Sequence, residues 1–194
     1  MKEHELHNYK LVLQYEGIRY NGWQKQKNQE NTIQEVVENA VFDGTGERAE
    51  VIGSGRTDAG THAMGQVANV KLGQNLEPER LMDNINKHLP SDIKILECEK
   101  VDNRFHARLN AKAKTYMYTL CVGKKPDVFN RRTVLHYCAD LDVDAMKKAA
   151  EYLKGEHDFM SFCSNKRTKK STVRKIYDIE IIKDGDEISF IFKG

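Results

Sequence analysis

Hydrophobic and polar positions divide the first part of the chain into segments of two different periods. Apolar side chains take alternate positions in residues 9–15, which is the period of a half-buried strand. Apolar side chains at helical spacing follow in residues 33–41, directly after a capping box in which Thr32 precedes Glu35 by three positions. The pattern therefore predicts a strand followed by a helix.

The first half continues with four more predicted elements. Residues 49–53, 65–72 and 93–101 have the composition and length of strands. Pro78 suits the first turn of a helix, which we expect to extend to about residue 87. The predicted order in the first hundred residues is β-α-β-β-α-β.

The second half starts again with a strand, predicted over residues 113–122. Residues 142–153 have helical spacing, with Gly155 just past the end as a C-cap. Two further strands are predicted over residues 173–183 and 187–193, joined by a turn. If both halves follow one split α/β plan, the second lacks its last helix and about one strand, so the sequence looks truncated.

These elements predict an α+β protein of two related half-domains, whose mixed, largely antiparallel sheets are flanked by helices. We place the first domain at residues 1–105 and the second, incomplete one at 106–194. The chain of 194 residues has no run of about 18 apolar residues, and its start lacks the apolar stretch of a signal peptide. We therefore expect a cytoplasmic protein without a membrane span.

The distribution of charge and the cysteine spacing indicate the kind of partner and the state of the thiols. Residues 1–99 carry 11 basic and 16 acidic side chains, whereas residues 100–194 carry 20 and 13, so a polyanion would be drawn to the second half. Residues 164–175 hold six basic side chains, which form either a solvated loop or a phosphate-binding patch. The candidate RNA-binding residues are Lys166, Arg167, Lys169, Lys170, Arg174 and Lys175. The four cysteines form no C-x-x-C pair, and we expect free, mostly buried thiols.

The segment SGRTDAGTHA, residues 54–63, combines a cation, hydroxyls, a carboxylate and an imidazole between two predicted strands. A loop held by strands can expose Asp58 to a ligand. Taken alone, the residues favour a polar turn, because Asp, Gly and Thr are common turn formers. The pattern of a phosphate-binding loop is absent, and His62 and Asp58 have no metal-ligand partners at recognisable spacing.

Several motifs together resemble the TruA family of tRNA pseudouridine synthases. The resemblance spans nearly the whole chain and includes, in order, Tyr15-Glu16-Gly17, Asn21-Gly22-Trp23-Gln24-Lys25-Gln26, Thr32-Ile33-Gln34, residues 55–67, Arg104-Phe105-His106-Ala107-Arg108, Lys114-Thr115-Tyr116-Met117-Tyr118 and Gly155-Glu156-His157-Asp158-Phe159. It implies the pseudouridine synthase fold and an isomerase that converts uridine to pseudouridine at positions 38, 39 and 40 of the tRNA anticodon stem-loop.

The resemblance also implies roles for single residues. Asp58 is the nucleophile, and Tyr116 is the active-site aromatic expected to stack on the flipped uracil, the alternative being a strand residue in the core. Arg56, two residues before Asp58, is placed to fill the space of the flipped base or to hold a phosphate, the alternative being a surface ion pair. His62 and Gln66 belong to the motif without an assigned chemical role, and we expect them to shape the loop. No cofactor and no metal are needed, because every substrate atom is retained.

The family commonly forms homodimers, which no feature of this sequence proves. Family members continue into a helix with a Met-Val-Arg segment whose arginine pairs with the aspartate, and this segment is absent after Gly194, so the activity of the chain is in doubt. The alternative function is a noncatalytic RNA-binding protein in which Asp58 is structural.

Overall fold

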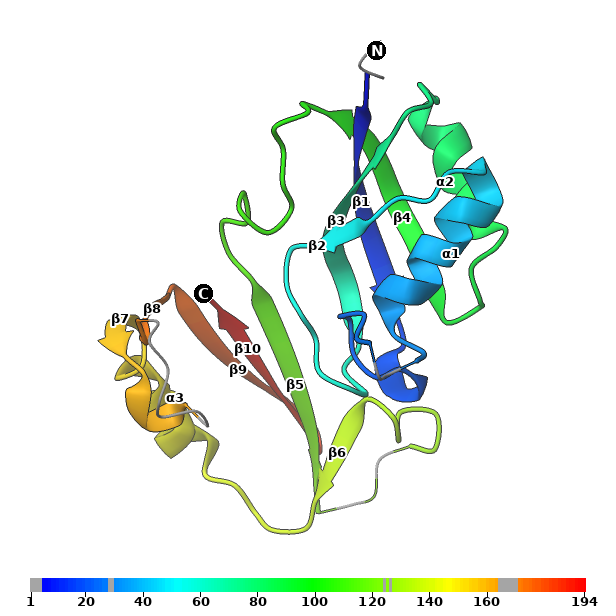
Figure 1. Ribbon diagram of the computed structural model, residues 1–194. Helices are drawn as coiled ribbons and strands as arrows, with labels where there is room; N and C mark the ends of the chain where they lie inside the picture. The colour runs from blue at the N-terminus through cyan, green and yellow to red at the C-terminus, as the bar shows by residue number, and fades with distance from the viewer. Residues whose placement is uncertain (1–4, 28–29, 124, 126, 164–170) are drawn as a thin grey trace. The chain divides into compact units, whose positions relative to one another are not determined.

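The computed structural model describes residues 5–27, 30–123, 125, 127–163 and 171–194. The chain forms two compact units, Met1–Ala111 and Lys112–Gly194, which are drawn together in Figure 1 and described separately below. The sequence placed this boundary at residue 105. Among the described residues, no helix is long and apolar enough to cross a lipid bilayer.

The first unit is a four-stranded antiparallel sheet with two helices on one face (Figure 1). The strand order is β2-β3-β1-β4, so β1 lies in the interior of the sheet between β3 and β4. The elements are β1 (His7–Tyr15), α1 (Ile33–Thr45), β2 (Val51–Gly53), β3 (Ala63–Leu72), α2 (Pro78–Asn86) and β4 (Ile93–Val101), with a short 3-10 helix η1 (Gly17–Arg19) after β1.

Alternation along β1 produces the core of this unit. The strand buries Tyr9, Leu11 and Leu13 completely and Tyr15 almost completely, and this face packs under the two helices. Burying a side chain of this size contributes about 1.5–3 kcal/mol, so this one strand supplies a large part of the driving force. The predicted strand and its buried face are confirmed.

The ends of α1 follow the signals in the sequence. The Thr32 hydroxyl accepts a hydrogen bond from the backbone N–H of Glu35, which is the N-cap half of the predicted capping box. Gly46 ends the helix with φ of 76°, a left-handed conformation that glycine adopts without a Cβ clash. Pro78 is the first residue of α2, as predicted.

The second unit is built on a mixed sheet with the order β6-β5-β10-β9. The β5–β6 pair is parallel, whereas β10 pairs antiparallel with both β5 and β9. The elements are β5 (Thr115–Val122), β6 (Val134–Tyr137), α3 (Val143–Glu151), β7 (Gly155–Asp158), η2 (Met160–Phe162), β8 (Val173–Ile176), β9 (Asp178–Asp184) and β10 (Glu187–Lys193). Helix α3 packs against β9, and β7 pairs with β8 in a separate small ladder. The predicted α+β class with mixed, largely antiparallel sheets is confirmed.

Four details differ from the sequence predictions. Strands β6 and β7 were not predicted, and the single strand expected over residues 173–183 is divided at Tyr177, where the chain leaves β7 as its partner and joins β10. Helix α3 ends at Glu151, and Gly155 opens β7 instead of capping the helix. The cysteines are free, but only Cys121 is buried and Cys138 is exposed.

Candidate active site

The segment that contains Asp58 connects β2 to β3 at one end of the first sheet. The backbone N–H of Ser54 donates to the carbonyl of Val67 at 2.7 Å, so the loop leaves the ladder directly after Gly53. Within the loop the N–H of Thr61 donates to the carbonyl of Asp58 at 3.1 Å, and Gly60 has φ of 79°. These are the features of a type II turn, which requires glycine at its third position. The turn places Asp58 at its first position.

The Asp58 side chain is exposed at this turn. Its carboxylate makes no hydrogen bond or ion pair with any other residue of the described part of the chain. The neighbouring Thr57 hydroxyl shares a hydrogen bond of 2.9 Å with the Tyr15 hydroxyl and does not bond to the turn backbone. The interpretation that Asp58 and Thr57 merely satisfy the N–H groups of the turn therefore has no support in these contacts.

A second segment, residues 17–23, holds the loop from the side. The N–H of Trp23 donates to the carbonyl of Thr57 at 3.0 Å, and the N–H of Gly60 donates to the carbonyl of Tyr20 at 3.2 Å. The approach is closest at Gly17, where a Cβ would lie 1.8 Å from the carbonyl oxygen of Thr61. Glycine is required here because two backbones touch.

The Trp23 side chain fixes the root of the loop. It is buried, and a Cβ added to Gly53 would lie 2.5 Å from the indole ring. The rings of Trp23 and Tyr15 lie 6.2 Å apart in a tilted arrangement. Burial raises the pKa of Tyr15, while hydrogen bonds from Thr57 and Gln66 oppose the rise, so the phenol is neutral at physiological pH.

His62 and Gln66 shape the loop, as the sequence predicted. The Nδ1 atom of His62 accepts a hydrogen bond of 3.3 Å from the N–H of Gly17. Gln66 accepts from the Ser54 hydroxyl at 2.9 Å and donates to the carbonyl of Gly55 at 2.8 Å, which closes the two ends of the loop against each other.

Arg56 lies two residues before Asp58 and is exposed. Its Nε–H donates to the side-chain oxygen of Gln24 at 3.1 Å. Within the described part of the chain, Arg56 forms no ion pair with a carboxylate, so the alternative role as half of a surface ion pair is not seen here. The two residues that the motif singled out thus share one braced loop.

Tyr116 belongs to the second unit, where it lies on β5 opposite Phe192 of β10. Its side chain is 56% exposed, so it is available to a ligand although it sits in a sheet. Of the six basic residues proposed for RNA binding, Lys166, Arg167, Lys169 and Lys170 lie outside the described residues. Arg174 and Lys175 are exposed on β8. Arg174 donates to the carbonyls of Ser171 and Val173, and the Lys175 ammonium lies 5.4 Å from the centre of the Tyr177 ring.

Sequence reasoning missed a charged anchor beneath η1. The Nε of Arg19 and the hydroxyl of Tyr20 both donate to the carboxylate of Asp92, at 2.9 and 2.6 Å. Burial works against ionisation of Asp92, but these two hydrogen bonds outweigh it and lower the pKa of Asp92. Burial and the hydrogen bond to Asp92 raise the pKa of Tyr20. The anchor holds the segment that braces the loop.

A buried asparagine pair, Asn8 and Asn69, holds residues 102–107, which overlap the Arg104–Arg108 motif. Asn8 donates to the carbonyls of Asp102 and Phe105, both at 2.9 Å, and accepts from Asn69 at 3.0 Å. Asn69 in turn accepts from the N–H of Ala107 at 2.9 Å. Both asparagines are at most 1% exposed, and the bonds from Asn69 to Asn8 and from the N–H of Ala107 to Asn69 are buried.

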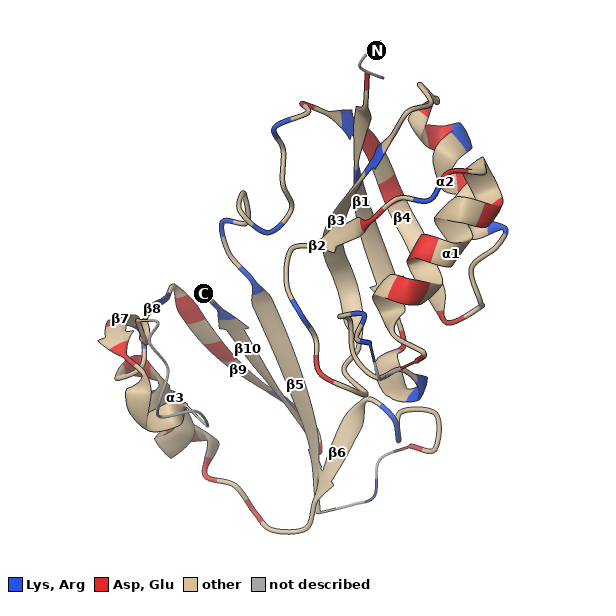
Figure 2. Ribbon diagram, in the orientation of Figure 1, with Lys and Arg blue, Asp and Glu red and all other residues tan. Residues whose placement is uncertain are grey.

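Basic residues follow in the same segment. Figure 2 shows Lys and Arg positions along the connection from β4 to β5, whereas acidic positions gather on α1 and α2. His106 accepts from the N–H groups of Arg108 and Leu109 at its Nδ1 atom, at 3.3 and 3.4 Å. It anchors the loop of residues 106–109.

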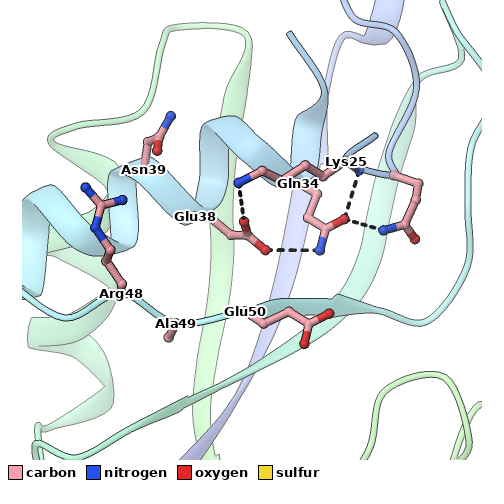
Figure 3. Close-up of a pocket in the computed structure, with 8 residues that line it drawn as sticks. Lys25, Gln34, Glu38, Asn39, Arg48, Ala49 and Glu50 are labelled. Atoms are coloured by element: carbon pink, nitrogen blue, oxygen red, sulfur yellow. Dashed lines mark hydrogen bonds and ion pairs between the residues drawn. The ribbon is translucent and has the colours of Figure 1, made fainter. Parts of the chain in front are cut away.

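A shallow hollow of about 500 Å³ opens beside α1 and β2 (Figure 3). Its lining is polar and of mixed charge: Gln24, Lys25, Gln34, Glu38, Asn39, Arg48, Ala49 and Glu50. Asp58 and Arg56 do not line it, and Gln24 is the residue that connects it to Arg56. In the described part of the chain, no group of three or more His, Cys, Asp or Glu side chains is arranged to hold a metal ion.

Comparison with known proteins assigns the chain to a family. A family model described as tRNA pseudouridine synthase matches residues 11–110 and 149–194. The chain is 41% identical to tRNA pseudouridine synthase A 2 of Bacillus cereus over 189 residues, which cover 97% of this chain and 77% of that protein. It is 46% identical to tRNA pseudouridine synthase A of a Bacillus species over 176 residues, covering 91% of this chain and 72% of that protein.

A third relative comes from a different genus. tRNA pseudouridine synthase A of a Thermoanaerobacter species is 41% identical over 188 residues, which cover 95% of this chain and 75% of that protein. These matches confirm the resemblance that the motifs predicted. The chain belongs to the TruA family of tRNA pseudouridine synthases, which are isomerases.

Proposed function

We propose that this pseudouridine synthase acts on uridines 38, 39 and 40 in the anticodon stem-loop of tRNA and that Asp58 is its nucleophile. The observation that carries the proposal is the exposed Asp58 carboxylate on a loop fixed by Trp23, Tyr20 and His62. A carboxylate that makes no bond within the described residues is available to substrate, and a braced loop holds it in one position.

The chemistry needs only a nucleophile that attacks and later leaves. The bond from the ribose C1′ to N1 of uracil breaks, the base turns, and a bond from C1′ to C5 forms. The proton on C5 is lost and N1 gains one, so the product is an isomer of the substrate. A carboxylate can form the transient covalent bond, as carboxylates do in retaining glycosidases, either at C1′ or at C6 of the base.

The proposal also gives substrate-binding roles to Arg56, in the first unit, and to Tyr116, in the second. A base inside a folded RNA must leave its stack before a side chain can reach it, at a cost of a few kcal/mol. Arg56, on the same loop as Asp58, offsets this cost by filling the vacated space or holding the backbone phosphate. Tyr116 offers an exposed ring on which the uracil can stack, and base–aromatic stacking contributes about 1–3 kcal/mol.

The proposed partner is tRNA, bound in part by basic side chains. Arg174 and Lys175 are exposed on β8, and further basic residues follow β4, so phosphate contacts from these segments would make binding weaken with salt. A homodimer and a cytoplasmic location are part of the proposal, because family members commonly pair and their substrate is cytoplasmic tRNA.

Asp58→Asn tests the proposal, with Asp43→Asn as its matched control. Asp43 is an exposed aspartate on α1, so the control makes the same chemical change away from the loop. Chemical labelling of pseudouridine in unmodified tRNA should show complete loss of conversion in Asp58→Asn and normal conversion in Asp43→Asn. The tRNA dissociation constant should stay within about threefold in both variants, because the amide keeps the shape of the carboxylate.

The outcomes separate the competing functions. Turnover that survives in Asp58→Asn would show that another group is the nucleophile. Wild-type protein that binds tRNA and leaves uridines 38, 39 and 40 unchanged would favour the noncatalytic RNA-binding alternative, with Asp58 as a structural residue.

A further inference from the structure

Polar side chains connect helix α1 to Arg56 through three successive hydrogen bonds. The first runs from Nε2 of Gln34 to Oε1 of Glu38 at 3.0 Å, and the second from Nε2 of Gln24 to Oε1 of Gln34 at 2.7 Å. The third runs from Nε of Arg56 to Oε1 of Gln24 at 3.1 Å. We call these three hydrogen bonds the relay, and Figure 3 shows the part of the relay around Gln34 and Glu38.

The direction of every bond in this relay is fixed by its two ends. An ionised carboxylate only accepts hydrogen bonds and a guanidinium only donates them. Gln34 must therefore turn its NH₂ group to Glu38, which leaves its oxygen for Gln24. Gln24 must then donate to Gln34, which leaves its own oxygen for Arg56. Neither amide can flip without placing two acceptors or two donors against each other.

Backbone groups hold the middle of the relay in place. Gln34 is only 4% exposed, its NH₂ group also donates to the carbonyl of Val51, and its oxygen also accepts from the N–H of Lys25. Glu38 accepts from the N–H of Val51 and pairs with the Lys25 ammonium at 3.3 Å. The relay is thus built into the edge of the sheet, where β2 meets α1.

We propose that Gln24 is a positioning residue for Arg56. It holds the Nε edge of the guanidinium, so that the Nη groups are oriented for the RNA before it binds. An arginine on an exposed loop would otherwise sample many rotamers, and ordering its long side chain as the base leaves its stack slows the reaction by about 2- to 12-fold. Because Arg56 is proposed to act while the base is out of its stack, this inference rests on the proposed function and adds a residue to it.

A purely structural role for Gln24 makes a different prediction. If Gln24 only stabilised the loop, its loss would harm the enzyme whether or not Arg56 is present. If Gln24 acts through Arg56, its loss should matter only while Arg56 is there. A double-mutant cycle measures this difference directly.

The cycle consists of wild type, Gln24→Met, Arg56→Ala and the double variant, with Gln14→Ala as a control. Methionine keeps the length of Gln24 without its hydrogen bonds, and Gln14 is an exposed glutamine on β1. We expect Gln24→Met to lower the single-turnover rate on unmodified tRNA by about tenfold, with the dissociation constant for tRNA changed by less than about threefold. In the Arg56→Ala background the same change should alter the rate by less than about twofold.

An independent measurement follows the hydrogen bond itself. The Nε–H of Arg56 should give a protected ¹⁵N–¹H signal in wild type that exchanges faster with solvent in Gln24→Met, and thermal unfolding shows whether the variant is folded. A folded Gln24→Met with wild-type rate and protection overturns the inference alone. The same tenfold loss in both backgrounds also overturns it and assigns Gln24 a structural role. Wild-type protein that makes no pseudouridine overturns the proposed function and this inference together.

Discussion

Gly22→Ala should displace the turn that carries Asp58. Gly22 is buried with φ of 79°, and a Cβ at this position would lie 2.6 Å from the carbonyl oxygen of Thr57. It would also lie 3.2 Å from the carbonyl carbon of Asp58 and from the backbone nitrogen of Ala59. All three atoms belong to loop backbone, so no side chain can rotate out of the way.

The magnitude follows from two separate costs. The left-handed conformation costs a residue with a Cβ about 1–2 kcal/mol. Because ordinary contact begins at 3.4 Å, the Thr57 carbonyl must also withdraw by about 0.8 Å, and such overpacking costs about 1–3 kcal/mol. We expect a free energy of unfolding lowered by about 2–5 kcal/mol. Since a shift near 1 Å in a reacting group can cost about 100-fold, we also expect a reaction rate lowered by about 100-fold.

Gly46→Ala separates these two costs. Gly46 has φ of 76° at the end of α1, and a Cβ there would meet no atom within 4 Å. The control therefore carries the conformational cost without the clash. Urea unfolding should show about 1–2 kcal/mol lost in Gly46→Ala and more in Gly22→Ala, and only Gly22→Ala should lose activity in the single-turnover assay. A folded Gly22→Ala that converts uridine within about threefold of wild type would refute the argument.

Two further predictions concern Asn69, which anchors residues 102–107, and Asp92, which anchors the segment after η1. Asn69→Leu should lower the free energy of unfolding by about 1–3 kcal/mol for each buried group it leaves unpaired, and urea unfolding with an unchanged m-value checks this. A urea midpoint of Asn69→Leu equal to that of wild type would show that the asparagine pair does not stabilise the fold. Asp92 has a lowered pKa in the folded state, so its contribution is present above about pH 4 and is lost as the pH falls through the folded value. In Asp92→Asn the free energy of unfolding should therefore fall less steeply as the pH is lowered below about 4 than in wild type. An equally steep fall in the variant would contradict this.

Local signals in the sequence predicted the elements that depend on local chemistry. Alternation located β1, Thr32 marks the start of α1, and Pro78 begins α2. Each of these features is fixed by backbone preferences and by hydrogen bonds within a few residues, so it can be found without knowing the fold. The motif of residues 55–67 likewise located the loop that holds Asp58.

Elements that depend on a distant partner were missed. Strands β6 and β7 have four residues each, too few for a clear period, and they exist because β5 and β8 lie beside them. The division between β8 and β9 at Tyr177 has the same origin, because alternation continues through the residue at which the chain changes its partner strand. Helix α3 ends at Glu151, and Gly155 is paired with Ile176 in β8 instead of capping the helix.

The sequence by itself determined the family, the class of fold and the loop on which the chemistry is proposed to occur, because motifs and periodicity are properties of neighbouring residues. Only the tertiary structure decided what holds that loop. Gly22 touches it from 35 positions earlier in the chain, and Gln24 reaches Arg56 across 32 positions. Such contacts follow from packing η1 and α1 against one end of the sheet, and no spacing along the chain encodes them.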